Sequence, residues 1–356
     1  MRRIGDGKRP GWALLCALIL VVTFLAVSYA GDAKPTQAKP MELRFSHFVP
    51  GRHPIQAGGF EPWAKAVEER TGGRIKITFY PAQTLCKAKD NYDAVVSGIA
   101  DIAFASIAYT PGRFPLSEVL FLPFIGSVSA QDCTRIYQEL FKKFPQMQDE
   151  YSEVKVLWLH TCAAAGLSSN KKPIRRLEDI QKMLVRAPGP LAATVEELGA
   201  TPVSISAPDT YMAMEKGTVD AMFFPNESLK TLKLYEVTKY HTIGAECMYA
   251  PFCVAMNLKV WNSLPPDIQR IIEEESVKAA VLNAKNWDKG DKDAIEFVKA
   301  KGHELIYLSP QEIERWRAKT QPLWDKWVAD KEAKGLPGKE VLGETVRLMK
   351  ESKKGS

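Results

Sequence analysis

Residues 92–106, YDAVVSGIADIAFAS, and residues 211–225, YMAMEKGTVDAMFFP, share the pattern that decides the fold. Each stretch begins with Tyr-x-Ala, reaches a Gly six positions after the Tyr and an Asp three positions later, and then becomes apolar. A Gly can end a helix in the left-handed conformation, and a short apolar run after a turn predicts a buried strand. The chain is therefore expected to contain the same helix–turn–strand unit twice.

The segments before each unit also correspond. Residues 63–71 and 191–199 have the spacing of amphipathic helices, and apolar stretches at 74–80 and 202–206 predict strands after them. Helix, strand, helix, strand is the order typical of α/β lobes with parallel sheets. Because 356 residues fit about two domains of ~150 residues, we predict an α/β protein of two similar lobes.

Two such lobes predict a ligand-binding cleft between them. Ligands of open α/β sheets lie beyond the carboxyl ends of the strands. His160 and Thr161, after a strand over residues 154–159, are expected at the lobe junction, although a buried structural histidine fits the sequence equally well. The candidates at the ends of the two repeated strands are Ala105, Ser106 and Tyr109 in one lobe and Phe223, Phe224 and Asn226 in the other.

Arg186 carries the strongest chemical signal. It follows a short predicted strand over residues 183–185, and a turn, APGP, joins it to the helix over residues 191–198. A guanidinium beside a helix N-terminus is suited to holding a carboxylate through two parallel hydrogen bonds. An arginine paired with a surface carboxylate is the equally weighted alternative at this point.

Composition excludes several other functions. The net charge is only +6, and no stripe of Lys and Arg with interleaved aromatic residues occurs, so nucleic-acid binding is not expected. Five His and the lack of a CxxC motif argue against a metal site, and no cofactor is expected. The motifs GxSxG and HExxH and a phosphate loop are also missing, so the sequence does not predict an enzyme.

The first thirty residues have the features of a secretory signal peptide. Basic residues precede an apolar run over residues 12–27, which is shorter than the ~20 residues of a membrane-spanning helix, and Ser-Tyr-Ala follows. We expect cleavage after Ala30, a flexible leader over residues 31–40, and a periplasmic location. Five Cys remain after cleavage, so at least one is unpaired; an oxidising compartment permits a Cys247–Cys253 disulfide without requiring it.

The last third of the chain is predicted to be helical. A long helix is expected over residues 266–301, with a kink or break at Gly290. A further helix is expected to begin at Ser309, with Trp316, Leu323, Trp324 and Trp327 on its apolar face. Residues 336–356 are expected to form a C-terminal tail.

A series of short motifs follows in order along the chain: HF at 47–48, ERTGGR at 69–74, GIAD at 98–101, GRFP at 112–115, LPF at 122–124, KPI at 172–174, LED at 177–179, VRAPG at 185–189, LGATP at 198–202, Tyr211 and GTVD at 217–220. In this order and spacing they make the sequence resemble the solute-binding proteins of TRAP transporters, the DctP family, from about residue 43 to residue 327.

The resemblance implies a periplasmic-binding-protein (Venus flytrap) fold. Lobe 1 would comprise residues 41–160 with part of 249–285, and lobe 2 residues 161–248 with part of 286–335. The two lobes would close over an organic acid, and a long helix would link them. The protein would deliver the acid to a permease of one small and one large membrane subunit, driven by an ion gradient.

Within this family an arginine of an R-x-P motif pairs with the ligand carboxylate, and Arg186 matches it. Two positions depart from the pattern of some members: Gly166 replaces a second arginine, and Phe224 replaces an asparagine. We therefore expect a monocarboxylate whose apolar or aromatic body lies against Phe48, Phe223 or Phe224. Because side chains alternate along a strand, only one of the last two is expected to face the cleft.

Two other functions remain open from the sequence. An exported receptor that serves a sensor or an ATP-driven importer would need the same two lobes. A periplasmic enzyme is the less favoured alternative, since the Ser, Cys and His residues show no recognisable catalytic arrangement.

Overall fold

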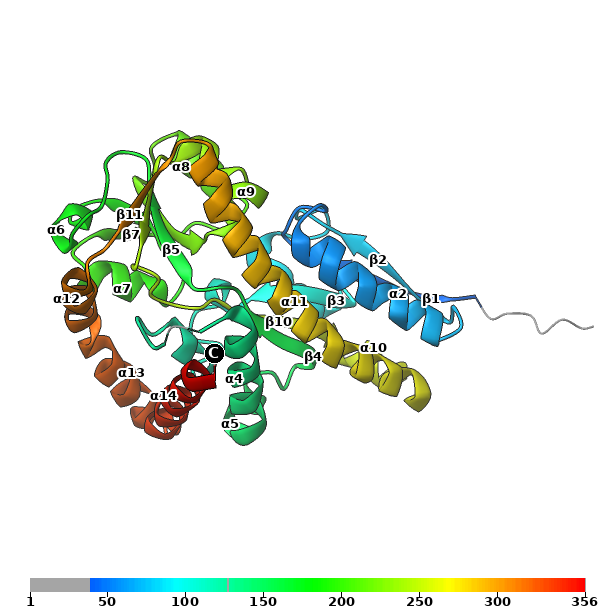
Figure 1. Ribbon diagram of the computed structural model, residues 1–356. Helices are drawn as coiled ribbons and strands as arrows, with labels where there is room; N and C mark the ends of the chain where they lie inside the picture. Colours follow the sequence, from blue (N-terminus) through cyan, green and yellow to red (C-terminus); the bar gives the residue numbers. More distant parts are fainter. Residues whose placement is uncertain (1–38, 127, 356) are drawn as a thin grey trace, which may run out of the picture. The chain divides into compact units, whose positions relative to one another are not determined.

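Two mixed β-sheets organise the part of the chain that the computed structural model describes, residues 39–126 and 128–355. The described residues after Pro40 form one unit, in which each sheet is covered by helices (Figure 1). The predicted signal peptide lies outside the described residues, as does the leader up to residue 38. None of the described helices is both long enough and apolar enough to span a bilayer.

The first sheet has five strands in the order β2-β1-β3-β10-β4. Strand β1 pairs in parallel with β2 and β3, whereas β10 runs antiparallel to β3 and β4. We call this sheet and the helices on it lobe 1. Its elements are β1 (Met41–Ser46), α2 (Glu61–Arg70), β2 (Ile75–Tyr80), α3 (Asn91–Ser97), β3 (Ile102–Ser106), α4 (Ala130–Lys143), α5 (Pro145–Asp149), β4 (Val154–Thr161), β10 (Pro251–Asn257) and α10 (Leu258–Ser263).

The second sheet has six strands in the order β11-β9-β5-β8-β6-β7, and we call it and its helices lobe 2. Strand β6 is parallel to β7 and β8, whereas β5 is antiparallel to β8 and β9. The elements are β5 (Ala165–Ser169), α6 (Leu177–Ile180), β6 (Leu184–Arg186), α7 (Leu191–Glu197), β7 (Thr201–Val203), α8 (Thr210–Glu215), β8 (Ala221–Pro225), α9 (Glu227–Thr231), β9 (Tyr240–Ile243) and β11 (Glu304–Tyr307).

The repeated pattern forms equivalent turns in the two lobes. Gly98 follows α3 with φ of 81°, and Gly217 follows α8 with φ of 68°. Each turn leads into a fully buried strand, β3 or β8. The two-lobed α/β prediction is confirmed, and each sheet combines parallel pairs with one strand antiparallel to its neighbours, β10 in the first and β5 in the second. The chain passes from β4 into β5 and returns from β9 to β10, and these crossing segments add antiparallel strands to both sheets.

The predicted long helix is present as α11 (Pro266–Ala300), which runs along both lobes (Figure 1). It packs on α2 and α4 of lobe 1 and on α9 of lobe 2. The helix continues through Gly290 without a break, contrary to the expected kink. A Cβ at Gly290 would lie 3.1 Å from the Cβ of Glu227, so this glycine allows α9 to approach α11 closely.

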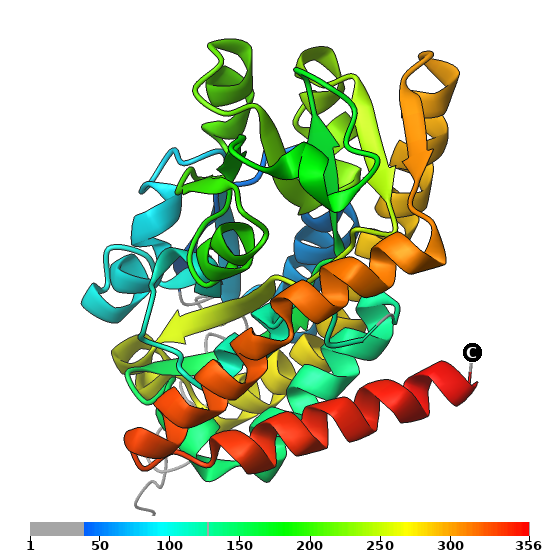
Figure 2. The ribbon, with the colours of Figure 1, turned by 90° about the vertical axis from the view of Figure 1, so that its left-hand side faces the viewer.

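The C-terminal region differs from the prediction in two ways. The helix that begins after Ser309 ends at Thr320, because Pro322 starts another: α12 (Pro310–Thr320) is followed by α13 (Pro322–Ala333). The expected tail is the helix α14 (Gly338–Gly355), which packs on α13 and on α4 (Figure 2). Its buried Val341, Leu348 and Met349 explain why this segment is ordered.

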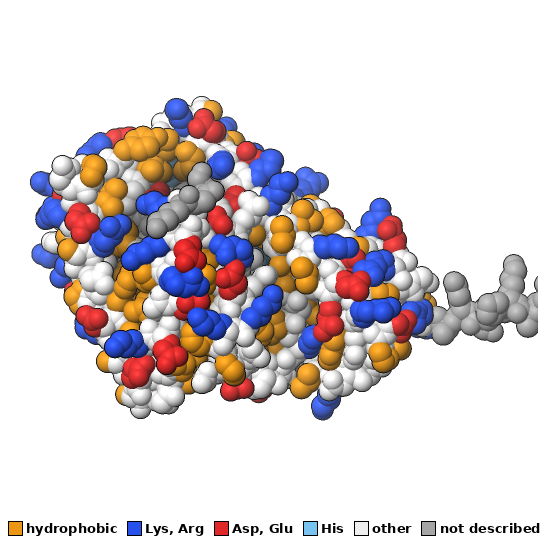
Figure 3. All heavy atoms as spheres, turned by 60° about the horizontal axis from the view of Figure 1, so that its bottom comes forward, with side chains coloured by type: hydrophobic (Ala, Val, Ile, Leu, Met, Phe, Trp, Pro, Cys, Tyr) orange, Lys and Arg blue, Asp and Glu red, His pale blue; other side chains and the backbone are white. Residues whose placement is uncertain are grey.

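Neither disulfides nor a metal site stabilise the described part of the chain. Figure 3 shows one face on which acidic and basic side chains are interspersed. All five described cysteines are free, so Cys247 and Cys253 do not form a disulfide. Across the described ranges, no group of His, Cys, Asp and Glu has the arrangement of a metal site.

Candidate functional site

A cavity of about 50 Å³ lies where the strand ends of the two lobes meet. This is several times the ~10–15 Å³ that one water molecule needs. Contacts of Tyr109 with Ala207 and of His53 with Glu227 connect the lobes across it, which indicates a closed arrangement. The predicted residues that line it are Phe48, Ser106 and Tyr109 from lobe 1 and Arg186, Phe223 and Phe224 from lobe 2.

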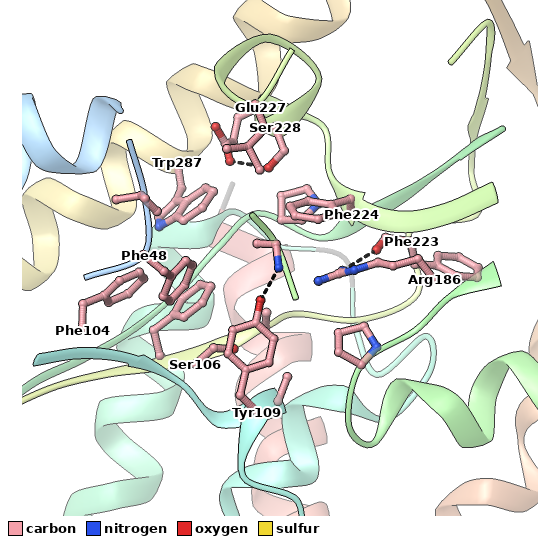
Figure 4. Close-up of a pocket in the computed structure, with 18 of the residues that line it drawn as sticks. Phe48, Phe104, Ser106, Tyr109, Arg186, Phe223, Phe224, Glu227, Ser228 and Trp287 are labelled. Carbon is pink, nitrogen blue, oxygen red and sulfur yellow. Dashed lines mark hydrogen bonds between the residues drawn. The ribbon is translucent and has the colours of Figure 1, made fainter. Parts of the chain in front are cut away.

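Arg186 is held rigidly at one side of this cavity. It ends strand β6 and is only 5% exposed. Its Nε donates to the carbonyl of Ile205 at 3.1 Å, and its Nη1 donates to the carbonyl of Phe223 at 3.0 Å. The guanidinium carbon lies 4.2 Å from the centre of the Phe224 ring. Figure 4 shows the guanidinium pointing toward the middle of the cavity.

The charge of Arg186 has no counter-ion among the described residues. No carboxylate of residues 39–126 or 128–355 forms an ion pair with it, and the nearby Tyr109 hydroxyl is a neutral partner. Burial lowers the pKa of Arg186 from its ordinary value. Since burying an unpaired ion costs several kcal/mol, the site is arranged to gain stability from an anion that enters the cavity.

Phe223 and Phe224 contribute to the site in different ways. The Phe223 side chain is fully buried in the lobe core, and its backbone carbonyl orients Arg186. The Phe224 ring forms one wall and supports the guanidinium through a cation–π contact. As expected from the alternation of side chains along β8, only the ring of Phe224 faces the cavity.

Aromatic rings form the wall of the cavity on the lobe 1 side. Phe48 stacks on Phe104 with ring centres 4.9 Å apart, and Phe252 stacks on Trp287 at 5.8 Å. The Tyr109 ring packs edge-on against Phe48, while its hydroxyl accepts a hydrogen bond of 2.7 Å from the backbone N–H of Ala207. That last bond joins the two lobes beside Arg186.

Four predicted residues lie outside the cavity lining: Ala105, which is buried in the lobe 1 core, His160, Thr161 and Asn226. Strand β4 continues through Thr161, so His160 and Thr161 belong to the strand rather than to a loop beyond it. The His160 ring stacks on Phe104 behind the aromatic wall, and burial lowers its pKa to about 3. The Thr161 backbone N–H donates to Thr134 of α4. Asn226 is engaged with α11 instead, because its backbone N–H donates to Asp291 at 2.9 Å.

A contact between a histidine and a glutamate, which no sequence pattern predicts, joins the lobes at the cavity. His53 Nε2 of lobe 1 lies 3.2 Å from Glu227 Oε2 of lobe 2, and both side chains are 2% exposed. Ser228 and Thr231 also donate hydrogen bonds to the Glu227 carboxylate. Burial opposes its ionisation, but His53 and the two hydroxyl groups outweigh that effect and lower the pKa of Glu227. No local motif connects residues so far apart in sequence.

The turn after Arg186 also touches the opposite lobe. Gly189 has φ of 57°, and a Cβ there would lie 2.5 Å from the backbone oxygen of Ala108 in lobe 1.

At Gly166, where some family members have an arginine, a Cβ would lie 2.5 Å from Asn226 Oδ1. An arginine at that position would therefore require the Asn226 side chain to move.

A two-lobed fold with a buried cation in an inter-lobe cavity defines a ligand-binding protein. The family model of the bacterial extracellular solute-binding proteins, family 7 (DctP), matches residues 45–331, and the chain belongs to this family. Among curated relatives, the C4-dicarboxylate-binding periplasmic protein DctP of Rhodobacter capsulatus is 25% identical over 305 residues, covering 82% of this chain and 88% of the relative.

Two solved structures are similar over nearly the whole described chain. A TRAP solute-binding protein from Rhodoferax ferrireducens, in complex with copurified benzoate, aligns with a TM-score of 0.83 and 26% identity, covering 88% of this chain and 99% of the other. A marine metagenome TRAP solute-binding protein specific for aromatic acid ligands, crystallised with 3-hydroxybenzoate, aligns with a TM-score of 0.83 and 28% identity over the same shares. This chain is accordingly a binding protein and not an enzyme.

Proposed function

We propose that this protein captures a small organic acid, with one carboxylate and an apolar or aromatic body, between its two lobes. The observation that carries the proposal is Arg186, a buried guanidinium that faces the cavity without a counter-ion among the described residues. A ligand carboxylate would supply that counter-ion through charge-assisted hydrogen bonds.

The rest of the cavity supports an aromatic body. Its walls are the rings of Phe48, Phe104, Phe224, Phe252 and Trp287, which offer apolar faces at stacking distances. Sugar acids carry several hydroxyl groups that these walls would leave without partners. The two similar structures that hold benzoate and 3-hydroxybenzoate support the same ligand class.

We further propose that the protein works outside the cytoplasmic membrane as the receptor of a TRAP-type permease of one small and one large subunit. Family membership and the predicted signal peptide support this location. Opening and closing would occur about the segments that connect β4 to β5 and β9 to β10, with ligand selecting the closed state.

A thermal-shift screen of residues 31–356 tests the proposal. Benzoate, phenylacetate and indole-3-acetate are compared with succinate and sialic acid, using the wild type, Arg186→Gln and the control Arg175→Gln. Arg175 is a lobe 2 arginine whose side chain is 56% exposed. The aromatic acids should stabilise the wild type and the control but not Arg186→Gln, since truncating one partner of a buried charge pair costs ~2–5 kcal/mol, about thirtyfold to several thousandfold in affinity.

A preference for succinate or sialic acid would refute the aromatic ligand. Equal stabilisation of the wild type and Arg186→Gln would refute the role of Arg186.

The proposed location is tested by mass spectrometry of the periplasmic fraction, which should find a mature chain that begins at Gly31. An uncleaved protein retained in the cytoplasm would contradict this location.

A further inference from the structure

The cavity contains a second buried charge, of opposite sign to Arg186. Glu227 begins helix α9 and lines the cavity, and Figure 4 places it with Ser228 across the cavity from Tyr109. Its carboxylate is paired with His53 rather than with Arg186. The cavity is therefore polarised, with a cation at one position and an anion at another.

The neighbours of Glu227 hold its carboxylate in the charged form. Ser228 donates to Oε1 at 2.7 Å, Thr231 donates to Oε2 at 2.6 Å, and His53 lies against Oε2. A carboxylate has about four lone-pair positions, so one acceptor position on Oε1 remains. This part of the cavity can accept a hydrogen bond but has no cation left to pair with a ligand carboxylate.

A second carboxylate, that of Asp291, adds negative charge on the same side. Asp291 of α11 accepts hydrogen bonds from the backbone and side chain of Asn226, the residue next to Glu227. Burial and the proximity of Glu227 and Glu246 raise the pKa of Asp291 to about 6. Two unit charges of the same sign repel strongly at short range where water is excluded.

We propose that Glu227 is a specificity-determining residue that excludes acids with a second carboxylate and favours those with a hydrogen-bond donor at the far end. This inference rests on the proposed function, because it assumes that the first carboxylate pairs with Arg186. A dicarboxylate anchored in that way would have to bring its second charge toward Glu227 or bury it against the aromatic walls. Either placement of the second carboxylate costs more free energy than its new contacts would contribute.

Four ring acids that differ only at the meta position test the inference by calorimetry at pH 7.5. They are benzoate, 3-hydroxybenzoate, 3-nitrobenzoate and benzene-1,3-dicarboxylate. The nitro group has nearly the shape of a carboxylate but no net charge, so it separates repulsion from steric exclusion. The wild type should bind the dicarboxylate at least tenfold more weakly than 3-nitrobenzoate, and it should bind 3-hydroxybenzoate at least as tightly as benzoate.

Glu227→Gln keeps the shape of the side chain and removes its charge. In this variant the ratio between 3-nitrobenzoate and the dicarboxylate should fall to within threefold, whereas the control Glu246→Gln, outside the lining of this cavity, should keep the wild-type ratio. An unchanged ratio in Glu227→Gln would overturn the inference. If that variant does not fold, the wild-type series decides alone: equal binding of the two acids, or equal rejection, overturns it.

The result also separates this inference from the proposed function. Binding of benzoate that requires Arg186, together with equally tight binding of the dicarboxylate, would overturn only the role of Glu227. Failure of all four acids to bind would overturn the aromatic-acid function and this inference together.

Discussion

Substituting Gly189 by Ala should separate lobe closure from the integrity of the fold. Gly189 follows Arg186 in the turn that leads to α7, and its nearest neighbour across the cavity edge is the backbone of Ala108. A Cβ would lie 2.5 Å from the Ala108 oxygen and 3.0 Å from its Cα. Backbone atoms cannot rotate away as a flexible side chain would, so relief requires the two lobes to move apart by about 1 Å, back to ordinary contact distance.

Two costs are expected from this change. The left-handed φ of 57° costs roughly 1–2 kcal/mol for a residue with a Cβ, whether the lobes are open or closed. The clash with Ala108 adds roughly 1–3 kcal/mol in the closed state alone, by analogy with overpacking. Ligand affinity should therefore fall about fivefold to 150-fold, because only the second cost opposes closure.

Gly217→Ala provides a matched control. Gly217 has a similar φ of 68°, but no atom lies within 4 Å of the position of its Cβ. Both variants should lose similar stability in thermal melts without ligand. In calorimetric titrations with the acid selected by the screen, only Gly189→Ala should lose affinity. Equal affinities of the two variants would show that this contact does not form when ligand binds, which would refute the closure mechanism.

The ring beside Arg186, two helical glycines and one buried carboxyl group allow three further predictions. Phe224→Leu should weaken acid binding about twofold to thirtyfold, because the cation–π support of Arg186 is lost; unchanged affinity would contradict this. Gly343→Ala, on α14 with open space around the added Cβ, should raise Tm. Gly290→Ala should not raise Tm, because its Cβ would crowd Glu227; equal changes in the Tm of the two variants would contradict this prediction. Burial raises the pKa of Glu150 to about 7, above its unfolded value, so the Tm of the wild type relative to that of Glu150→Gln should rise as the pH falls from 8 to 5.5; a constant or falling difference would contradict it.

The parts of the fold that depend on local signals were predictable from the sequence. Gly98 and Gly217 end their helices in the left-handed conformation, as the repeated pattern requires, and Arg186 ends its strand. Ser309 caps α12 by accepting from the backbone N–H of Glu312. These features depend on residues within a few positions of one another, so their spacing in the sequence is informative.

The errors arise where no local signal marks a boundary. The apolar run that forms β4 continues without a turn residue, so the strand end beyond His160 and Thr161 was placed too early. In α14 the buried Val341 and Leu348 have helical spacing, but the Lys residues around them resemble those of a solvated tail. The pairing of His53 with Glu227 depends on closure of two lobes, which no single segment encodes.

A crystal structure of residues 31–356 with the tightest-binding acid from the screen tests the central claim most directly. We predict that the ligand carboxylate lies within hydrogen-bonding distance of Arg186, with the ligand body among Phe48, Phe224 and Trp287. An acid bound with its carboxylate away from Arg186, or outside this cavity, would contradict the account.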